Sequence, residues 1–143
     1  MPTYTAPLED MMFLYEKLRN NKHYNELEKY KDITSDLVKD ILQEAAKINQ
    51  NIILPLAKAG DENPTILENG IVRTPPGYKE AYSKFIEDGW QSLSCDTKYG
   101  GQGMPKTVSA FFDEMLSSSS LAFKLYTELS IGCLLYTSDA ADE

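Results

Sequence analysis

The sequence predicts a mainly α fold with one small β-hairpin, and three observations carry this prediction. Apolar residues recur every three or four positions over most of the 143-residue chain, as one buried helical face requires. The dipeptide Asn69-Gly70, between the segments TILE and IVRT, is the pair best suited to a two-residue hairpin turn. A composition of 42% hydrophobic and 25% charged residues is typical of a globular protein. We therefore expect four or five helices and one hairpin in a single domain.

The first helix is predicted from Leu8 to Leu18, with Pro7 in its first turn. Its apolar residues gather on one face, and they are Leu8, Met11, Met12, Tyr15 and Leu18. The polar stretch RNNKHYNELEKYKD that follows is typical of a connection containing at most a turn of helix.

A long second helix is expected to begin at a cap formed by Thr34 or Ser35. The apolar residues on its expected buried face are Leu37, Ile41, Ala45, Ile48 and Ile52. Proline removes a backbone donor and clashes with the preceding turn, so Pro55 is predicted to kink or end this helix.

The hairpin predicted around Asn69-Gly70 has no neighbouring strand. Because an isolated two-stranded hairpin is only marginally stable, we expect it to pack against helices or against parts of the protein missing from this chain. The segment PPG at 75–77 then opens a third helix that Gly89 should stop. The apolar residues of this helix share one face, and they are Tyr78, Tyr82, Phe85 and Ile86.

After the loop QSLSCDTKYGGQGMPK, a helical region is predicted from Lys106 to Ile131. The run Ser117 to Ser120 favours turns and caps over helix interior, so this region is expected to form two helices. From Cys133 onward the helical periodicity stops.

Composition excludes several classes of function. A net charge of -8 argues against a nucleic-acid surface, because phosphate binding needs clustered Lys and Arg. The longest apolar run, Ile52 to Ala57, is far shorter than the roughly 20 residues of a membrane span. The start of the chain lacks the features of a signal peptide, so the expected location is the cytoplasm. Free thiols are the default there, so Cys95 and Cys133 are expected to be unpaired.

The loop YGGQGMP is the obvious candidate for a phosphate-binding loop. A dinucleotide-binding fingerprint needs three glycines as G-x-G-x-x-G, but Gly101 and Gly103 are followed by Lys106 where the third should fall. The glycines are therefore interpreted as residues of a tight loop that need positive φ.

Candidate reactive groups do not form a recognisable active site. His23 is the only histidine and has no Cys or second His near it, which disfavours a metal centre. Asp113 and Glu114 are adjacent in a helix and point to different sides, so they cannot act as an acid/base pair. Cys95 has no basic partner in sequence, which favours an inert thiol. The aromatic residues at helical spacings, Phe111, Phe112, Phe123 and Tyr126, are more typical of a core than of a cofactor site.

Taken as strings, several segments resemble the N-terminal helical region of acyl-CoA dehydrogenases. They are MPTYTAPLEDMMFLYEKL, TPPGYKEAYSKFIEDGW, YGGQGMP and DEMLSSSSLAFKLYTELSIG. Their order and spacing match that family, and the resemblance extends over nearly the whole chain to Gly132. The opening segment is similar to an N-terminal extension in one branch, which includes enzymes resembling 3-methylmercaptopropionyl-CoA dehydrogenase.

The resemblance implies the N-terminal helical domain of the acyl-CoA dehydrogenase fold. Full-length members also have a middle β-domain that holds much of the FAD and a C-terminal bundle with the catalytic glutamate. The implied parent oxidises acyl-CoA to enoyl-CoA, passes electrons to an acceptor and assembles as a homo-oligomer. This chain alone is expected to be inactive, to have no catalytic or metal-binding residue, to bind no FAD stably and to expose apolar surface where partner domains are missing.

Within this family the N-terminal domain contributes part of the acyl-pocket wall, and the resemblance places that wall on the last helix. The tentative wall residues are Phe123, Tyr126, Thr127 and Ser130. The alternative is that these residues only pack the domain. At the level of function, the alternative is an independent helical interaction module without flavin chemistry.

The last eleven residues, CLLYTSDAADE, resemble the translation of a sequencing adapter. Cys133 to Glu143 are therefore interpreted as a foreign segment, and 1–132 as the native domain.

Overall fold

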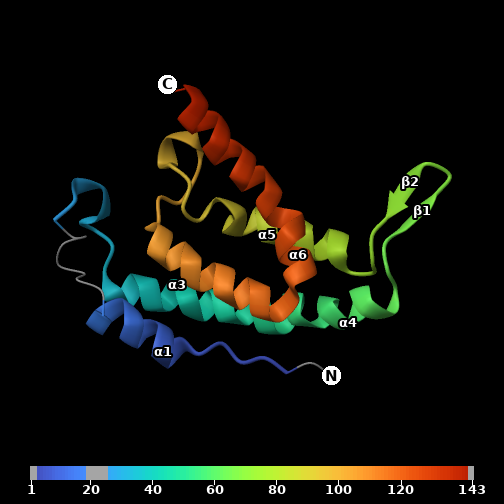
Figure 1. Ribbon diagram of the computed structural model, residues 1–143. Coiled ribbons are helices and arrows are strands. Elements are labelled where there is room, and N and C mark those ends of the chain that lie inside the picture. The colour runs from blue at the N-terminus through green and yellow to red at the C-terminus, as the bar shows by residue number, and fades with distance from the viewer. Residues whose placement is uncertain (1–2, 19–25, 142–143) are drawn as a thin grey trace.

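Figure 1 shows the computed structural model of the chain, which describes residues 3–18 and 26–141. Helices make up most of these residues, and the remaining regular structure is one two-stranded sheet. The predicted mainly α fold with a hairpin is therefore confirmed. None of the described helices is both long and apolar enough to cross a membrane.

Helix α1 spans Leu8–Phe13 and continues as a π-helical turn, η1, over Leu14–Leu18. Met11 and Tyr15 are buried as predicted, but Leu18 is 69% exposed. A π-helical turn contains more residues than an α-helical turn. It therefore rotates Leu18 away from the stripe on which α-helical spacing would place it.

Helix α3 spans Ser35–Ile48 and begins at the predicted cap, where Thr34 Oγ1 accepts a hydrogen bond from Leu37 N at 3.1 Å. Its predicted buried face is wrong in the first two turns, because Leu37 is exposed and Ile41 only half-buried. The buried residues there are Val38 and Leu42. Apolar residues occur both at Leu37 and Ile41 and at the next positions, Val38 and Leu42. The packing of α3 against α1 and α6 buries Val38 and Leu42.

The chain stays helical through Pro55. A π-helical turn, η3, spans Asn49–Ile53, and helix α4 spans Leu54–Glu62. Pro55 lies in the first turn of α4, where its missing N–H is tolerated. The expected disruption thus takes the form of one wide turn, in which Leu54 N donates to Asn49 O.

The hairpin consists of β1, Ile66–Glu68, and β2, Ile71–Arg73, paired antiparallel with Leu67 opposite Val72. Asn69 and Gly70 have φ values of 52° and 76°, as a type I′ turn requires. All strand residues are exposed, and the hairpin projects away from the helices (Figure 1). The described helices therefore do not cover the strands.

Helix α5 spans Tyr78–Glu87, and Gly77 and Gly89 flank it with φ values of 82° and 77°. Tyr78 and Phe85 are buried as predicted. Ile86 is exposed instead, because the small residue Ala81 lies on the core side and centres the buried face there. Two single 3₁₀ turns follow, η4 at Trp90–Ser92 and η5 at Thr97–Tyr99. Another 3₁₀ turn, η2, lies earlier in the chain at Glu28–Tyr30.

Helix α6 spans Lys106–Ala141 and is broken at Ser120, which has the non-helical φ and ψ of -160° and 99°. Ser120 Oγ accepts a hydrogen bond from Phe123 N at 3.3 Å, so the predicted division into two helices is confirmed. The second helix extends beyond the predicted end at Ile131, because adding residues to an existing helix needs no new nucleation. The foreign origin of residues 133–143 stays a prediction.

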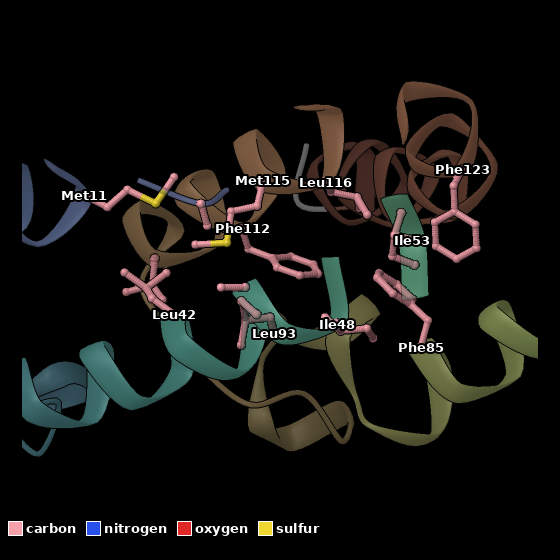
Figure 2. Close-up of a cluster of buried hydrophobic side chains, with 14 of the residues drawn as sticks. Met11, Leu42, Ile48, Ile53, Phe85, Leu93, Phe112, Met115, Leu116 and Phe123 are labelled. Atoms are coloured by element: carbon pink, nitrogen blue, oxygen red, sulfur yellow. The ribbon is translucent and has the colours of Figure 1, made fainter. Parts of the chain in front are cut away.

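The core lies between α3 with its π-turn, α5 and the two parts of α6. Figure 2 shows side chains from these elements meeting in one cluster that includes Leu42, Ile53, Phe85, Phe112 and Phe123. The rings of Phe85 and Phe112 stack with centroids 5.9 Å apart, and Phe112 stacks on Trp90 at 4.9 Å. These aromatic contacts join α5 and η4 to the first part of α6.

Candidate functional site

The four residues predicted for the acyl-pocket wall divide between two faces of the second helix of α6. Phe123 and Thr127, one turn apart, are 0% and 2% exposed. Tyr126 and Ser130, also one turn apart, are exposed, Tyr126 by 52%. The structure therefore does not bring all four together on one surface.

Phe123 and Thr127 face the core of the domain. The Phe123 ring packs edge-on against Phe85, with centroids 5.6 Å apart, and lies 5.9 Å from the Tyr78 ring. The carbonyl oxygen of Thr127 accepts a hydrogen bond of 3.0 Å from Gln91 Nε2. These contacts hold the second helix against α5 and η4.

Tyr126 and Ser130 belong to a second surface, which we call the outer face of α6. Its residues are exposed and follow one side of the helix, and they are Leu121, Ala122, Leu125, Tyr126, Leu129 and Ser130. Tyr126 is anchored there by a T-shaped contact with Tyr82 at 5.2 Å. A continuous exposed apolar surface of this kind is typical of a binding or interaction site.

The outer face leads at its N-terminal end into a cavity of about 700 Å³, which we call the serine cavity. It lies between the base of the hairpin, α4 and the break in α6, and its walls include Asp61, Val72, Tyr78, Ser117 to Ser120, Ala122 and Tyr126. The hydroxyl of Ser119 is buried and has no hydrogen-bond partner among the described residues. The sequence showed the serine run as a helix break but did not indicate a cavity.

A smaller cleft of about 290 Å³ lies between η4 and the two parts of α6. Charged residues line it, but they form ion pairs. Lys124 Nζ lies 3.3 Å from Glu128 Oε1, and Lys106 Nζ lies 3.9 Å from Asp113 Oδ2. Neither carboxylate is therefore presented as an unpaired base.

Asp113 and Glu114 point to different sides, as predicted. Asp113 faces Lys106, whereas Glu114 lies near Tyr4 in the N-terminal segment. Burial raises the pKa of the Tyr4 hydroxyl above its ordinary value, and the negative charge of Glu114 adds to this effect. Two carboxylates on different sides of one helix cannot act on one bond.

The glycine-rich loop is explained by close packing. A Cβ atom on Gly101 would lie 2.2 Å from the carbonyl oxygen of Cys95, so only glycine fits. The Cys95 thiol is free and half-buried. Packing against the Cys95 main chain therefore accounts for the glycine at position 101.

Among the described residues, no group of three or more His, Cys, Asp or Glu side chains could hold a metal ion. His23, the isolated histidine of the sequence, lies outside the described residues.

Asp96 holds the loop that leads into YGGQG. Its Oδ1 accepts a hydrogen bond of 2.8 Å from Lys98 N, and its Oδ2 lies 3.5 Å from Lys29 Nζ. The Lys98 N–H first, and the charge of Lys29 in addition, hold the pKa of Asp96 below its ordinary value of 3.8. The ionised carboxylate therefore contributes to stability at neutral pH.

We expect Asp96→Asn to lower the urea midpoint at pH 7. Because the folded-state pKa is depressed, this contribution is present above pH 3.8 and is lost as the pH falls through the folded-state pKa. The difference between the variant and the original chain should therefore shrink at acidic pH. Asp40→Asn, which changes an exposed carboxylate without an ion pair in the described structure, is the control. A difference that does not depend on pH would contradict this interpretation.

The chain is similar to part of two known acyl-CoA dehydrogenases. No protein-family model matches the chain. The chain is 39% identical over 132 residues to 3-methylmercaptopropionyl-CoA dehydrogenase of Ruegeria pomeroyi, covering 92% of the chain and 22% of that protein. It is 26% identical over 129 residues to the broad-specificity linear acyl-CoA dehydrogenase FadE5 of Mycobacterium tuberculosis, covering 88% of the chain and 21% of that protein. The chain thus spans about a fifth of the length of these curated relatives.

Proposed function

Since this chain is related to acyl-CoA dehydrogenases over about nine-tenths of its length, we propose that it forms one wall of the acyl pocket in an FAD-dependent enzyme of that class. In this proposal the parent enzyme oxidises an acyl-CoA thioester to the enoyl-CoA. This chain supplies packing surface for the acyl group and supplies no catalytic residue.

The observation that carries the proposal is the outer face of α6. Tyr126 and Ser130 lie there among exposed leucines, and the Tyr82 ring holds Tyr126 in place. An apolar acyl group bound along this face would pack against each exposed leucine, and this contact would be shielded from water. In this proposal Phe123 and Thr127 do not contact the acyl group. They lie on the buried side of the helix and hold it in position.

The flavin chemistry is assigned to parts of the parent beyond this chain. FAD, when bound, accepts the hydride from the acyl group. At the glycine-rich loop, the close approach of the Cys95 main chain accounts for Gly101 without a cofactor. We therefore assign no step of flavin binding to these residues.

A chimera tests the proposal. Residues 1–132 replace the matching segment of the Ruegeria pomeroyi relative, and acyl-CoA oxidation is measured over a series of chain lengths. In this background Tyr126→Ala should enlarge the pocket and change the ratio of kcat/KM between long and short acyl groups by about tenfold. The bound flavin spectrum should stay the same.

Lys39→Ala, an exposed change on α3, is the matched control and should leave the chain-length ratio unchanged. If Tyr126→Ala also leaves this ratio and KM unchanged, the outer face is not the pocket wall. A folded chimera that neither binds flavin nor oxidises acyl-CoA would favour the independent interaction module instead.

A further inference from the structure

The turn η4 carries a side chain that reaches across to the second helix of α6. Gln91 Nε2 donates a hydrogen bond of 3.0 Å to the carbonyl oxygen of Thr127, although the two residues lie 36 positions apart in the chain. The Thr127 residue is 2% exposed, whereas Tyr126, its neighbour in the chain, is 52% exposed. The hydrogen bond therefore holds the helix at its buried side, directly behind the outer face.

The turn that presents Gln91 is itself fixed in place. The Trp90 ring stacks on Phe112 of the first part of α6, with centroids 4.9 Å apart. The carbonyl oxygen of Ser92 accepts a hydrogen bond of 3.0 Å from the backbone N–H of Gln102. Because the turn is anchored by these contacts, the Gln91 amide defines one position along the axis of the second helix.

Other contacts of this helix are less directional. The Phe123 ring packs on Phe85 with centroids 5.6 Å apart, and the Tyr126 ring packs on Tyr82 at 5.2 Å. Apolar burial is non-directional, whereas a hydrogen bond weakens steeply when its geometry is lost. A slip of one residue moves a helix by about 1.5 Å along its axis and turns it by about 100°. Such a slip would carry Tyr126 away from the outer face.

We propose that Gln91 is a positioning residue that sets the register of the second helix of α6. Through Tyr126 and Ser130 it thereby determines which acyl chain lengths the outer face accepts. The inference rests on the proposed function, in which the outer face is the wall of the acyl pocket. Gln91 itself lines the smaller cleft, whose described walls include neither Tyr126 nor Ser130, so it acts through the helix and not on the acyl group.

The smaller cleft allows a substitution that removes only the donor. Gln91→Met keeps an unbranched side chain of similar length, and the cleft of about 290 Å³ beside it leaves room for that side chain to turn. Gln91→Glu is the isosteric second variant, because its carboxylate cannot donate at pH 7. Gln102→Met is the matched control. It removes a hydrogen bond of 2.9 Å from Gln102 Nε2 to Gly89 O, which lies in the same loop region and not in α6.

NMR spectroscopy of the 143-residue chain tests the register. In both Gln91 variants the nuclear Overhauser contacts between the Tyr82 and Tyr126 rings should weaken. Amide hydrogen exchange from Phe123 to Ile131 should become about fivefold faster, as the loss of one hydrogen bond predicts. Gln102→Met should leave the ring contacts and these exchange rates unchanged.

Steady-state kinetics of the chimera with the Ruegeria pomeroyi relative tests the link to chain length. Gln91→Met should reduce the kcat/KM preference for the best acyl length over neighbouring lengths by about fivefold. The change should lie in KM, because the helix contacts the acyl chain and not the reacting atoms. The kcat for the best substrate and the flavin spectrum should stay the same, and Gln102→Met should keep the preference.

The two proposals fail in different ways. Ring contacts and exchange rates that stay unchanged in both Gln91 variants would overturn the register role and leave the pocket wall in place. A displaced helix with an unchanged chain-length preference would overturn the wall and, with it, the effect of Gln91 on specificity. Equal effects of Gln91→Met and Gln102→Met would show a general loosening of the loop and would also overturn the role of Gln91.

Discussion

Gly101→Ala is expected to lower the free energy of unfolding by about 3 kcal/mol or more. The new Cβ would lie 2.2 Å from the carbonyl oxygen of Cys95 and 2.6 Å from its Cβ. Cys95 cannot easily move away, because its N–H donates to Ser92 O at 3.0 Å and its carbonyl accepts from Gly103 N at 2.9 Å. Relief of the clash therefore requires these loop hydrogen bonds to break.

Urea unfolding followed by circular dichroism measures this loss. The matched control is Gly100→Ala, in the neighbouring residue, which has φ of +81° but nothing within 4 Å of the added Cβ. It should cost about 1 kcal/mol, from the left-handed backbone alone. Equal losses for the two variants would show that the close approach to Cys95 does not govern the loop.

Phe123→Ala is expected to destabilise the chain by about 3–5 kcal/mol. The Phe123 side chain is fully buried and contacts the rings of Phe85 and Tyr78 from the first turn of the second helix of α6. Its removal leaves a cavity at the point where that helix joins the core (Figure 2). The helix should then lose its fixed position against α5.

Tyr126→Ala provides the comparison on the same helix. Tyr126 is about half exposed and its ring contact is with the partly buried Tyr82, so we expect a loss of about 1 kcal/mol or less. Urea unfolding gives both free energies, and amide hydrogen exchange shows whether Phe123→Ala exposes the backbone of the second helix. A loss for Phe123→Ala no larger than for Tyr126→Ala would contradict the division of the four predicted residues between core and surface.

Much of the local structure follows from short segments of the sequence. Thr34 caps α3, Asn69-Gly70 forms the hairpin turn, and Ser120 divides α6, because each depends on hydrogen bonds or backbone angles within a few residues. The relation to acyl-CoA dehydrogenases was also visible in the order of the segments, and the comparisons support it. The burial of the site residues was harder to predict from the sequence. Helical spacing places Phe123 and Tyr126 near one another but does not show which of them faces the core.

Local sequence patterns were sufficient to predict the mainly α class, the helix starts and the hairpin turn. The tertiary structure decided which helical face is buried, as at Val38 and Leu42, because neighbouring apolar positions are equivalent until another element packs on one of them. It also buried Phe123 while leaving Tyr126 exposed, and it buried the Ser119 hydroxyl with no hydrogen-bond partner among the described residues. Burial depends on contacts between segments far apart in the chain, and no local pattern encodes those contacts.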